Sequence, residues 1–311
     1  MRERRQSSRK KARGPNRVPP FFLAGCTLPC LLLTLYFTVY PAIRAFLLSF
    51  TNSTMLSLNR VDFVFLENYI YMFHDDRFLQ ALANTVKLLL VVPVFTLAVS
   101  LILAFILVQC KLREKAVYRT LFFFPSILSL TVDGVLWSFV FHPTMGILNS
   151  LLRWLGLDSL ALSWTGDART ALWCIAAVLV WQAAGYYMVM HIAAMDGISP
   201  EIYEAATIDG AGSATKFFRI TLPLIKNIVG ITYVLSLSGT LSLSYVLVRV
   251  ITGGGPNGAS NVLLAYIYNI GMENGSYGYA MAMTVVTGIF TVGLSILSQR
   301  LINHSREGGE V

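Results

Sequence analysis

The sequence is short of charged residues for its length. Only 13% of its 311 residues are Asp, Glu, Lys or Arg, whereas soluble domains carry about 25%. Apolar residues make up 55% of the chain, and they lie in long runs instead of short amphipathic stripes. This composition excludes an ordinary soluble domain and favours a protein that spans a membrane.

Cysteine is also scarce. The four cysteines lie in apolar runs or at the end of one, without His partners at metal-ligand spacing, and no pair suggests an extracellular disulfide. We interpret all four as small packing residues and expect no metal site. The residues are Cys26, Cys30, Cys110 and Cys174.

The motifs of common catalytic sites are missing as well. The sequence contains no G-x-x-x-x-G-K-[ST] phosphate loop, no H-E-x-x-H and no G-x-S-x-G. The chain is therefore not expected to be an enzyme or to hold a cofactor of its own. If ATP drives this protein, a separate chain must hydrolyse it.

Six long apolar segments dominate the sequence. A run of about 20 apolar residues crosses the bilayer core of about 30 Å as a helix, and a helix satisfies its own backbone hydrogen bonds in lipid. Short alternating segments, which a β-barrel would need, are not visible. We predict an all-α bundle of about six transmembrane helices in a domain of residues 21–311, the first span being retained in the mature protein. The segments are about 21–50, 82–109, 117–141, 171–195, 221–248 and 277–301.

The distribution of Lys and Arg predicts the orientation. Seventeen lie in the tail 1–20 and in the segments on its side of the membrane, against five in the opposite loops. The positive-inside rule then places both termini in the cytoplasm. The basic tail lacks interleaved aromatic residues, so we expect contact with anionic membrane lipids and no binding of nucleic acid.

The loop between the fourth and fifth spans, residues 199–223, has a distinctive pattern. Ser199 and Pro200 are typical of a helix start, and Asp209, Gly210 and Gly212 are typical of a helix end. A second short helix is expected at about 213–218. From spacing alone, this loop could dock a protein or could lie on the membrane as an amphipathic segment.

A resemblance decides between these readings. The segments Glu204-Ala205-Ala206, Asp209-Gly210-Ala211 and Ile220-x-Leu222-Pro223 resemble the EAA signature of permeases of binding-protein-dependent ABC importers. The resemblance covers residues of about 80–300. It implies a coupling loop that docks on an ATPase subunit, which binds the ATP and Mg²⁺. This sequence departs from many relatives at Ala214-Thr215, where they have Trp-Gln.

The same resemblance implies partners, a substrate class and a location. Further motifs are similar to carbohydrate-type permeases, of the maltose or glycerol-phosphate "first permease" type. They imply a carbohydrate substrate, a second permease subunit, two cytoplasmic ATPase subunits, an extracellular solute-binding protein and a bacterial cell membrane. The motifs are Asn84-Thr85, Pro125, Trp137, 146–149, 252–256, 266–268 and 278–280.

Polar residues inside the spans are candidates for the substrate pathway. Asp133 lies well inside the third segment, where a carboxylate needs a partner or a polar cavity. It could bind substrate hydroxyls, or it could pair with Lys87. Trp137 lies on the same helical face and could stack on a sugar or pack as an interfacial anchor. Gln182 and Tyr186 of the fourth segment pose the same choice, whereas His191 is interpreted as structural.

An ion-coupled secondary transporter is the alternative function. Such proteins use paired intramembrane charges and often contain internal repeats with broken helices. The sequence shows no clear repeat, and Asp133 is the one acidic residue placed well inside a span. The importer permease is therefore the preferred prediction.

Overall fold

The computed structural model describes residues 20–56, 61–109 and 114–307, and these are mostly helical. The predicted basic tail falls outside the described residues, apart from Pro20. Within the described ranges, extended pairing is limited to one isolated bridge between Thr51 and Phe63. The chain divides into two compact units, Met1–Leu47 and Leu48–Val311.

The described residues of the first unit form one nearly continuous apolar helix. α1 (Pro20–Thr34) passes through a short π-helical segment, η1 (Leu35–Val39), into α2 (Tyr40–Leu48). The stretch Gly25–Leu48 is long and apolar enough to cross a membrane. This agrees with the predicted first span.

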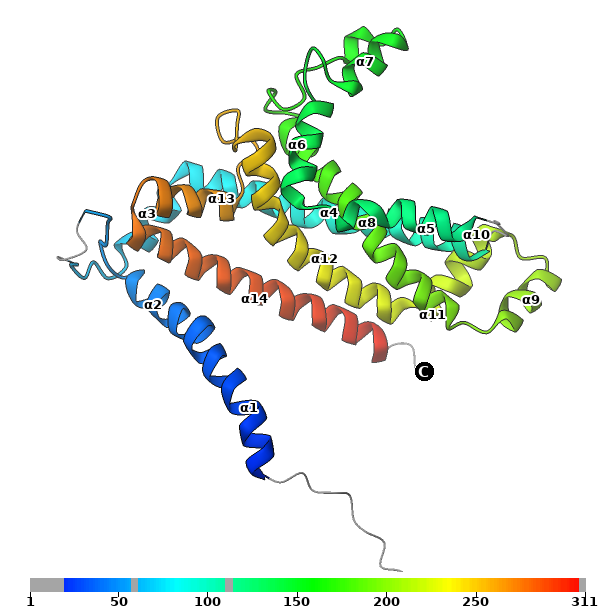
Figure 1. Cartoon of the computed structure of the whole chain (residues 1–311), viewed down its shortest axis with the longest axis horizontal. Helices are drawn as coiled ribbons and strands as arrows, with labels where there is room; N and C mark the ends of the chain where they lie inside the picture. Colours follow the sequence, from blue (N-terminus) through cyan, green and yellow to red (C-terminus); the bar gives the residue numbers. More distant parts are fainter. Residues whose placement is uncertain (1–19, 57–60, 110–113, 308–311) are drawn as a thin grey trace, which may run out of the picture. The chain divides into compact units, whose positions relative to one another are not determined.

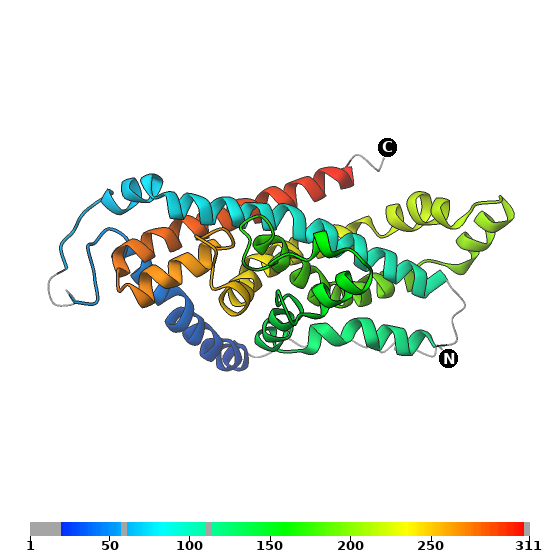
Figure 2. The ribbon, with the colours of Figure 1, turned by 90° about the horizontal axis from the view of Figure 1, so that it is seen from above.

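The second unit is a bundle built around long helices that run alongside one another (Figures 1 and 2). Each long helix is apolar over a stretch that suffices to cross a membrane, as the sequence predicts. The long helices are α4 (Asp76–Gln109), α8 (Ala171–Asp196), α12 (Lys226–Leu247), which continues into the π-helical η5 (Val248–Thr252), and α14 (Tyr277–Glu307).

The predicted third span is broken. α5 (Lys115–Phe123) and the 3-10 segment η2 (Phe124–Ile127) meet α6 (Leu130–Val140) at 99°. The break follows from the local sequence, because Pro125 cannot continue the hydrogen-bond ladder and Leu128 and Ser129 take extended conformations. The span predicted over 117–141 is therefore not one continuous helix, although its two parts together could form one span.

Short helices cap the two ends of the bundle. α9 (Pro200–Ile208), followed by α10 (Ser213–Thr215), η4 (Lys216–Thr221) and α11 (Leu222–Leu224), extends from one end (Figure 1). α3 (Glu67–His74), α13 (Leu263–Tyr268) and η6 (Asn269–Glu273) lie at the other end. The segment that connects α6 to α8 contains α7 (Ile147–Trp154) and η3 (Asp158–Leu160).

The core of this unit lies between α4, α8 and α12. His191 of α8 is fully buried there, and its two ring nitrogens lie 3.1 Å from the Ser100 hydroxyl of α4 and 3.1 Å from the Thr232 hydroxyl of α12. The imidazole is thus a satisfied structural group that links three helices. The prediction of a structural histidine is confirmed.

Candidate functional site: the coupling loop and the polar groups of the bundle

The loop 199–223 begins with a helix whose first residues match the sequence prediction. Ser199 takes an extended conformation at the N-cap, Pro200 occupies the first helical position, and Glu201 lies in the first turn. The Ser199 side chain, however, makes no capping hydrogen bond. Ser199 is thus the N-cap residue, as predicted, and proline and the favourable dipole contact of Glu201 are the local determinants of this helix start.

The end of α9 depends on Gly210. This residue has φ +78°, a left-handed conformation that non-glycine residues rarely adopt. The amide of Gly210 donates to the Thr207 carbonyl at 3.1 Å, and the amide of Ala211 donates to the Ala206 carbonyl at 2.8 Å. These two bonds form a Schellman motif, which ends the helix sharply and satisfies its last carbonyls.

The motif residues present two different faces. Glu204, Ala205, Asp209 and Gly210 are exposed, Ala206 is buried, and Ala211 is half-buried. The Ala206 methyl group therefore contributes to the packing of the loop, and the other motif residues form most of the outward face.

Ile208 was missed as a site residue by the sequence analysis. Its side chain is 88% exposed at the tip of α9, two residues before Gly210. A large apolar side chain presented in this way is a candidate anchor for a protein partner. An apolar residue between the Ala pair and the helix-ending glycine is the signal that could have identified it.

The loop is attached to the bundle by specific contacts. The Tyr203 hydroxyl lies 2.9 Å from the buried Thr221 hydroxyl, and Lys216 donates to the Thr207 hydroxyl at 2.8 Å. Phe217 makes an edge contact with Phe105 of α4, with the ring centroids 5.0 Å apart. The helix predicted for 213–218 does not end there but continues through η4 into α11. These contacts join α9 to η4, and η4 to α4.

The candidate pathway residues lie on two helices that touch. Asp133 and Trp137 are on α6, and the Trp137 ring lies 5.3 Å from that of Trp181 on α8. Gln182 is partly buried, and Tyr186 is 48% exposed on α8.

Asp133 has an unusual environment. Its side chain is 0% exposed, and neither carboxylate oxygen has a hydrogen-bond partner among the described residues. Pairing with Lys87, the alternative considered from the sequence, is not observed.

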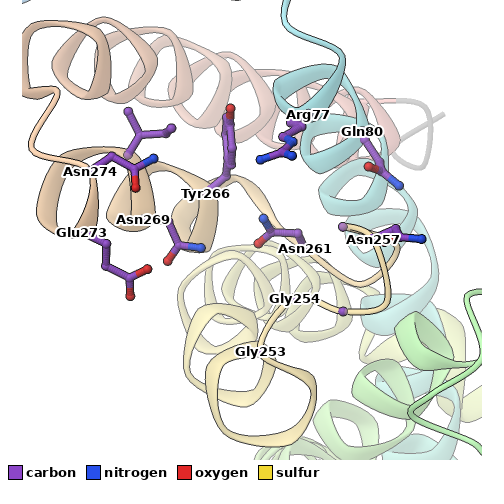
Figure 3. Close-up of a pocket in the computed structure, with 13 residues that line it drawn as sticks. Arg77, Gln80, Gly253, Gly254, Asn257, Asn261, Tyr266, Asn269, Glu273 and Asn274 are labelled. Atoms are coloured by element: carbon purple, nitrogen blue, oxygen red, sulfur yellow. The ribbon is translucent and has the colours of Figure 1, made fainter.

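At the end of the bundle opposite α9 is a polar cleft of about 470 Å³ (Figure 3). Arg77 and Gln80 of α4 lie on one side, and the glycine-rich loop after η5 lies on another. The remaining polar wall is formed by residues of α13 and η6 and the loop residues beside them. These are Asn257, Asn261, Tyr266, Asn269, Glu273 and Asn274.

Asn84 and Thr85 hold the glycine-rich loop in place. The buried Asn84 amide donates to the carbonyls of Gly258, Ala259 and Asn261 at 3.2, 3.0 and 3.0 Å. The Thr85 hydroxyl accepts a hydrogen bond from the backbone amide of Leu263 at 2.9 Å. The Asn-Thr pair, noted in the sequence as a similarity only, is thus the support of this loop.

Each of two clusters of charged and hydrogen-bonded side chains includes residues that line the cleft. Arg249 pairs with Glu273 at 2.5 Å and donates to the Asn269 side chain at 2.8 Å. In the second cluster, Asp75 accepts hydrogen bonds from the hydroxyls of Tyr266 and Tyr279 at 2.6 and 2.7 Å. Burial of Asp75 acts to raise its pKa, but these two bonds and two backbone amides outweigh it and hold the pKa below its ordinary value.

Comparison with known proteins agrees with this architecture. The family model described as "Binding-protein-dependent transport system inner membrane component" matches residues 65–306. The probable ABC transporter permease protein YurN of Bacillus subtilis is 37% identical over 79% of this chain and 84% of its own length. The diacetylchitobiose uptake system permease protein NgcF of Streptomyces coelicolor is 32% identical over 93% of this chain and 84% of its own length.

Solved structures show the same fold. A chain of a bacterial ABC transporter that imports the acidic polysaccharide alginate matches with a TM-score of 0.80 at 21% identity. The match covers 91% of this chain and 96% of that one. The family match and the relatives together confirm the predicted resemblance and the all-α membrane bundle. The chain belongs to the family of inner membrane components of binding-protein-dependent transport systems, and it is a multi-pass permease subunit of an ABC transporter.

Proposed function

We propose that this permease forms one half of the pathway of an ATP-driven importer for a sugar. A second permease would form the other half, two cytoplasmic ATPase subunits would bind ATP and Mg²⁺, and a solute-binding protein would deliver the substrate. Relatives named for diacetylchitobiose uptake and multiple-sugar transport support the substrate class. Nothing among the described residues favours the ion-coupled alternative.

The observation that carries this proposal is the geometry of α9. The Schellman motif at Gly210 fixes the helix end, so that Glu204, Ala205 and Asp209 share an exposed surface with Ile208. We assign this surface to the ATPase contact. The contact between Phe217 and Phe105 then gives a displaced loop a direct mechanical route to α4.

The orientation of the bundle follows from this assignment and from the positive-inside rule. Docking on the ATPases requires α9 to face the cytoplasm, as the excess of Lys and Arg on that side predicts. The polar cleft would then face outward. Its amide groups and its paired charges suit a wet, transient docking interface, so we assign the cleft to contact with the solute-binding protein.

Four residues are proposed for the substrate pathway: Asp133, Trp137, Gln182 and Tyr186. Their support is their position on α6 and α8, which touch, and the mixture of aromatic and hydrogen-bonding groups that sugars require. The assembled transporter would work by alternating access, with closure of the ATPases reorienting the helices through the coupling loop.

The proposal can be tested with a charged substitution at the exposed tip of α9. In cells that lack the native gene, Ile208→Glu should abolish uptake of labelled oligosaccharide and the co-purification of ATPase activity, at unchanged membrane abundance. The matched control is Leu160→Glu in η3, which is 51% exposed and lies on the predicted outer side. Normal uptake and normal ATPase recovery with Ile208→Glu would contradict the docking assignment.

A further inference from the structure

A cavity of about 300 Å³ is lined by residues of α4, α5 and α8. Its charged lining consists of Lys115 and Arg119, one helical turn apart on α5, and of Asp196, the last residue of α8. Its apolar lining includes Leu107 of α4 and Ile192 of α8, both of them buried. The cavity therefore combines charged groups at its opening with an apolar interior.

The two cations of this cavity have no acidic partner. Arg249 and Glu273 form the one ion pair found in the described part of the chain, at the other end of the bundle. The Lys115 ammonium donates to the Val108 carbonyl at 3.2 Å, and the Arg119 side chain is exposed. With one carboxylate among the three charged groups, the lining carries a net charge of +1 at neutral pH. An anionic group therefore complements the cavity.

The cavity lies at the coupling-loop end of the bundle. Asp196 ends α8, and α9 begins only four positions later at Pro200. In the orientation given above, this end meets the cytoplasmic headgroup layer of the membrane. From there α5 runs into the bilayer and carries exposed apolar side chains along its length. Val117, Leu121 and Phe124 are 64%, 61% and 54% exposed.

We propose that this cavity binds the headgroup of phosphatidylglycerol, an anionic phospholipid with a single phosphate. Lys115 and Arg119 donate to the phosphate oxygens, while the acyl chains lie against the exposed apolar side chains of α5. The Asp196 carboxylate accepts a hydrogen bond from a headgroup hydroxyl and repels a second phosphate. Basic pockets between transmembrane helices on the cytoplasmic side suit anionic headgroups. The site uses the orientation given under the proposed function and is independent of the transported solute.

A lipid bound here would connect two elements that matter for coupling. α5 is the cytoplasmic part of the broken span, and α8 leads into the loop that carries α9. A phosphate held by Lys115 and Arg119 beside Asp196 therefore bridges α5 and α8 at their cytoplasmic ends. The lipid should stabilise the contact between these helices.

Lipid retention tests the headgroup assignment. The full-length permease is purified with its associated subunits, and retained lipid is measured by native mass spectrometry after exchange into phosphatidylglycerol or phosphatidylcholine of equal acyl chains. Lys115→Gln/Arg119→Gln should retain about tenfold less phosphatidylglycerol, because each cation near the headgroups contributes to anionic-lipid binding. The control Arg219→Gln/Arg300→Gln removes two exposed cations outside the cavity and should behave as the native chain does. Equal retention of both lipids by the native chain, or equal losses in the two variants, would overturn the assignment.

A change of shape tests the cavity itself. Ala116 lines the cavity, whereas the neighbouring Val117 is exposed and is not part of the lining. Ala116→Phe should fill the cavity and abolish selective retention with both cations in place, and Val117→Phe should leave it unchanged. If charge at the membrane surface were sufficient, the two variants would retain lipid equally, and that result would overturn the cavity. The charge variant keeps the test valid if Ala116→Phe does not fold.

Two other ligands are distinguished by the same preparations. Displacement of the lipid by an excess of inorganic phosphate would assign the cations to a free anion and overturn the lipid site. Lipid retention that survives Lys115→Gln/Arg119→Gln, together with loss of the co-purified ATPase activity, would assign them to a protein partner and would also overturn it. Failure of the native transporter to take up sugar would refute the proposed function and leave the lipid measurement unaffected.

Discussion

Gly210→Ala isolates the contribution of the left-handed turn at the end of α9. The added Cβ atom would have no heavy atom within 4 Å, so the substitution introduces no clash within the chain. The substitution costs free energy because position 210 keeps the left-handed backbone conformation, with φ +78°. A residue with a Cβ atom adopts that conformation at a cost of about 1–2 kcal/mol. The population of the docking conformation should therefore fall by about 5–30-fold relative to alternative loop conformations.

Two companion substitutions make the reasoning specific. Gly212 also has no heavy atom within 4 Å of an added Cβ, but its φ is −70°, so Gly212→Ala should be without strain. Gly210→Asn should lie between the wild type and Gly210→Ala, because asparagine enters the left-handed region at a lower cost. The expected order of activity is wild type, Gly212→Ala, Gly210→Asn and Gly210→Ala, with the first two nearly equal.

The assay is ATP-dependent sugar uptake in proteoliposomes, together with the amount of ATPase retained on the purified permease. Equal activity of Gly210→Ala and wild type would refute the conformational argument. A second result would also contradict it. If Gly210→Asn lowers uptake more than Gly210→Ala does, the size of the side chain at the docked surface determines activity, and the backbone conformation does not.

Three other predictions concern the bundle and the cleft. Asn84→Ala removes the donor to three loop carbonyls and should lower the stability in detergent by about 2–4 kcal/mol, whereas Asn84→Asp should not rescue it because a carboxylate cannot donate. Asp75→Asn should lower the free energy of unfolding by about 1–2 kcal/mol at neutral pH, since a charged acceptor forms stronger hydrogen bonds than a neutral one. Because the pKa of Asp75 is lowered in the folded chain, this difference should be lost as the pH falls from about 3.9 through that lowered pKa, which a series of melting curves would show. His191→Leu should lower the free energy of unfolding by only about 1–2 kcal/mol, because the Ser100 and Thr232 hydroxyls keep their hydrogen bonds to backbone carbonyls. A decrease above about 4 kcal/mol would contradict this account.

The parts of this structure that the sequence could predict are those set by local rules. Long apolar runs specify helices in lipid, and the predicted spans for α4, α8, α12 and α14 are present. Pro200 and Gly210 specify the start and the end of α9 through their fixed or permissive backbone angles, and the helix ends at Ile208. These signals act over a few residues, so they can be read without knowing the tertiary structure.

The parts that could not be predicted depend on contacts between distant residues. Asn84 lies 174–177 residues from the carbonyls that it binds, and nothing in its local sequence identifies them. The exposure of Ile208 and the burial of Asp133 depend on which neighbours cover each residue in the folded chain. The pathway role of Asp133 stays a prediction, because a fully buried carboxylate in one conformation does not show what it faces in another.

The same helix, α4, reaches both functional ends of the bundle. Near its C-terminal end Phe105 contacts Phe217 of the coupling loop, and near its N-terminal end Asn84 holds the glycine-rich loop of the cleft. Their separation of 21 residues corresponds to about 30 Å of helix. His191 ties this helix to α8 and α12 between these points, so a displacement of the coupling loop reaches three helices at once. Because η5 continues directly from α12 and its Val250 packs closely against Gly134 of α6, a tilt of α12 would also reach α6, the helix that carries Asp133.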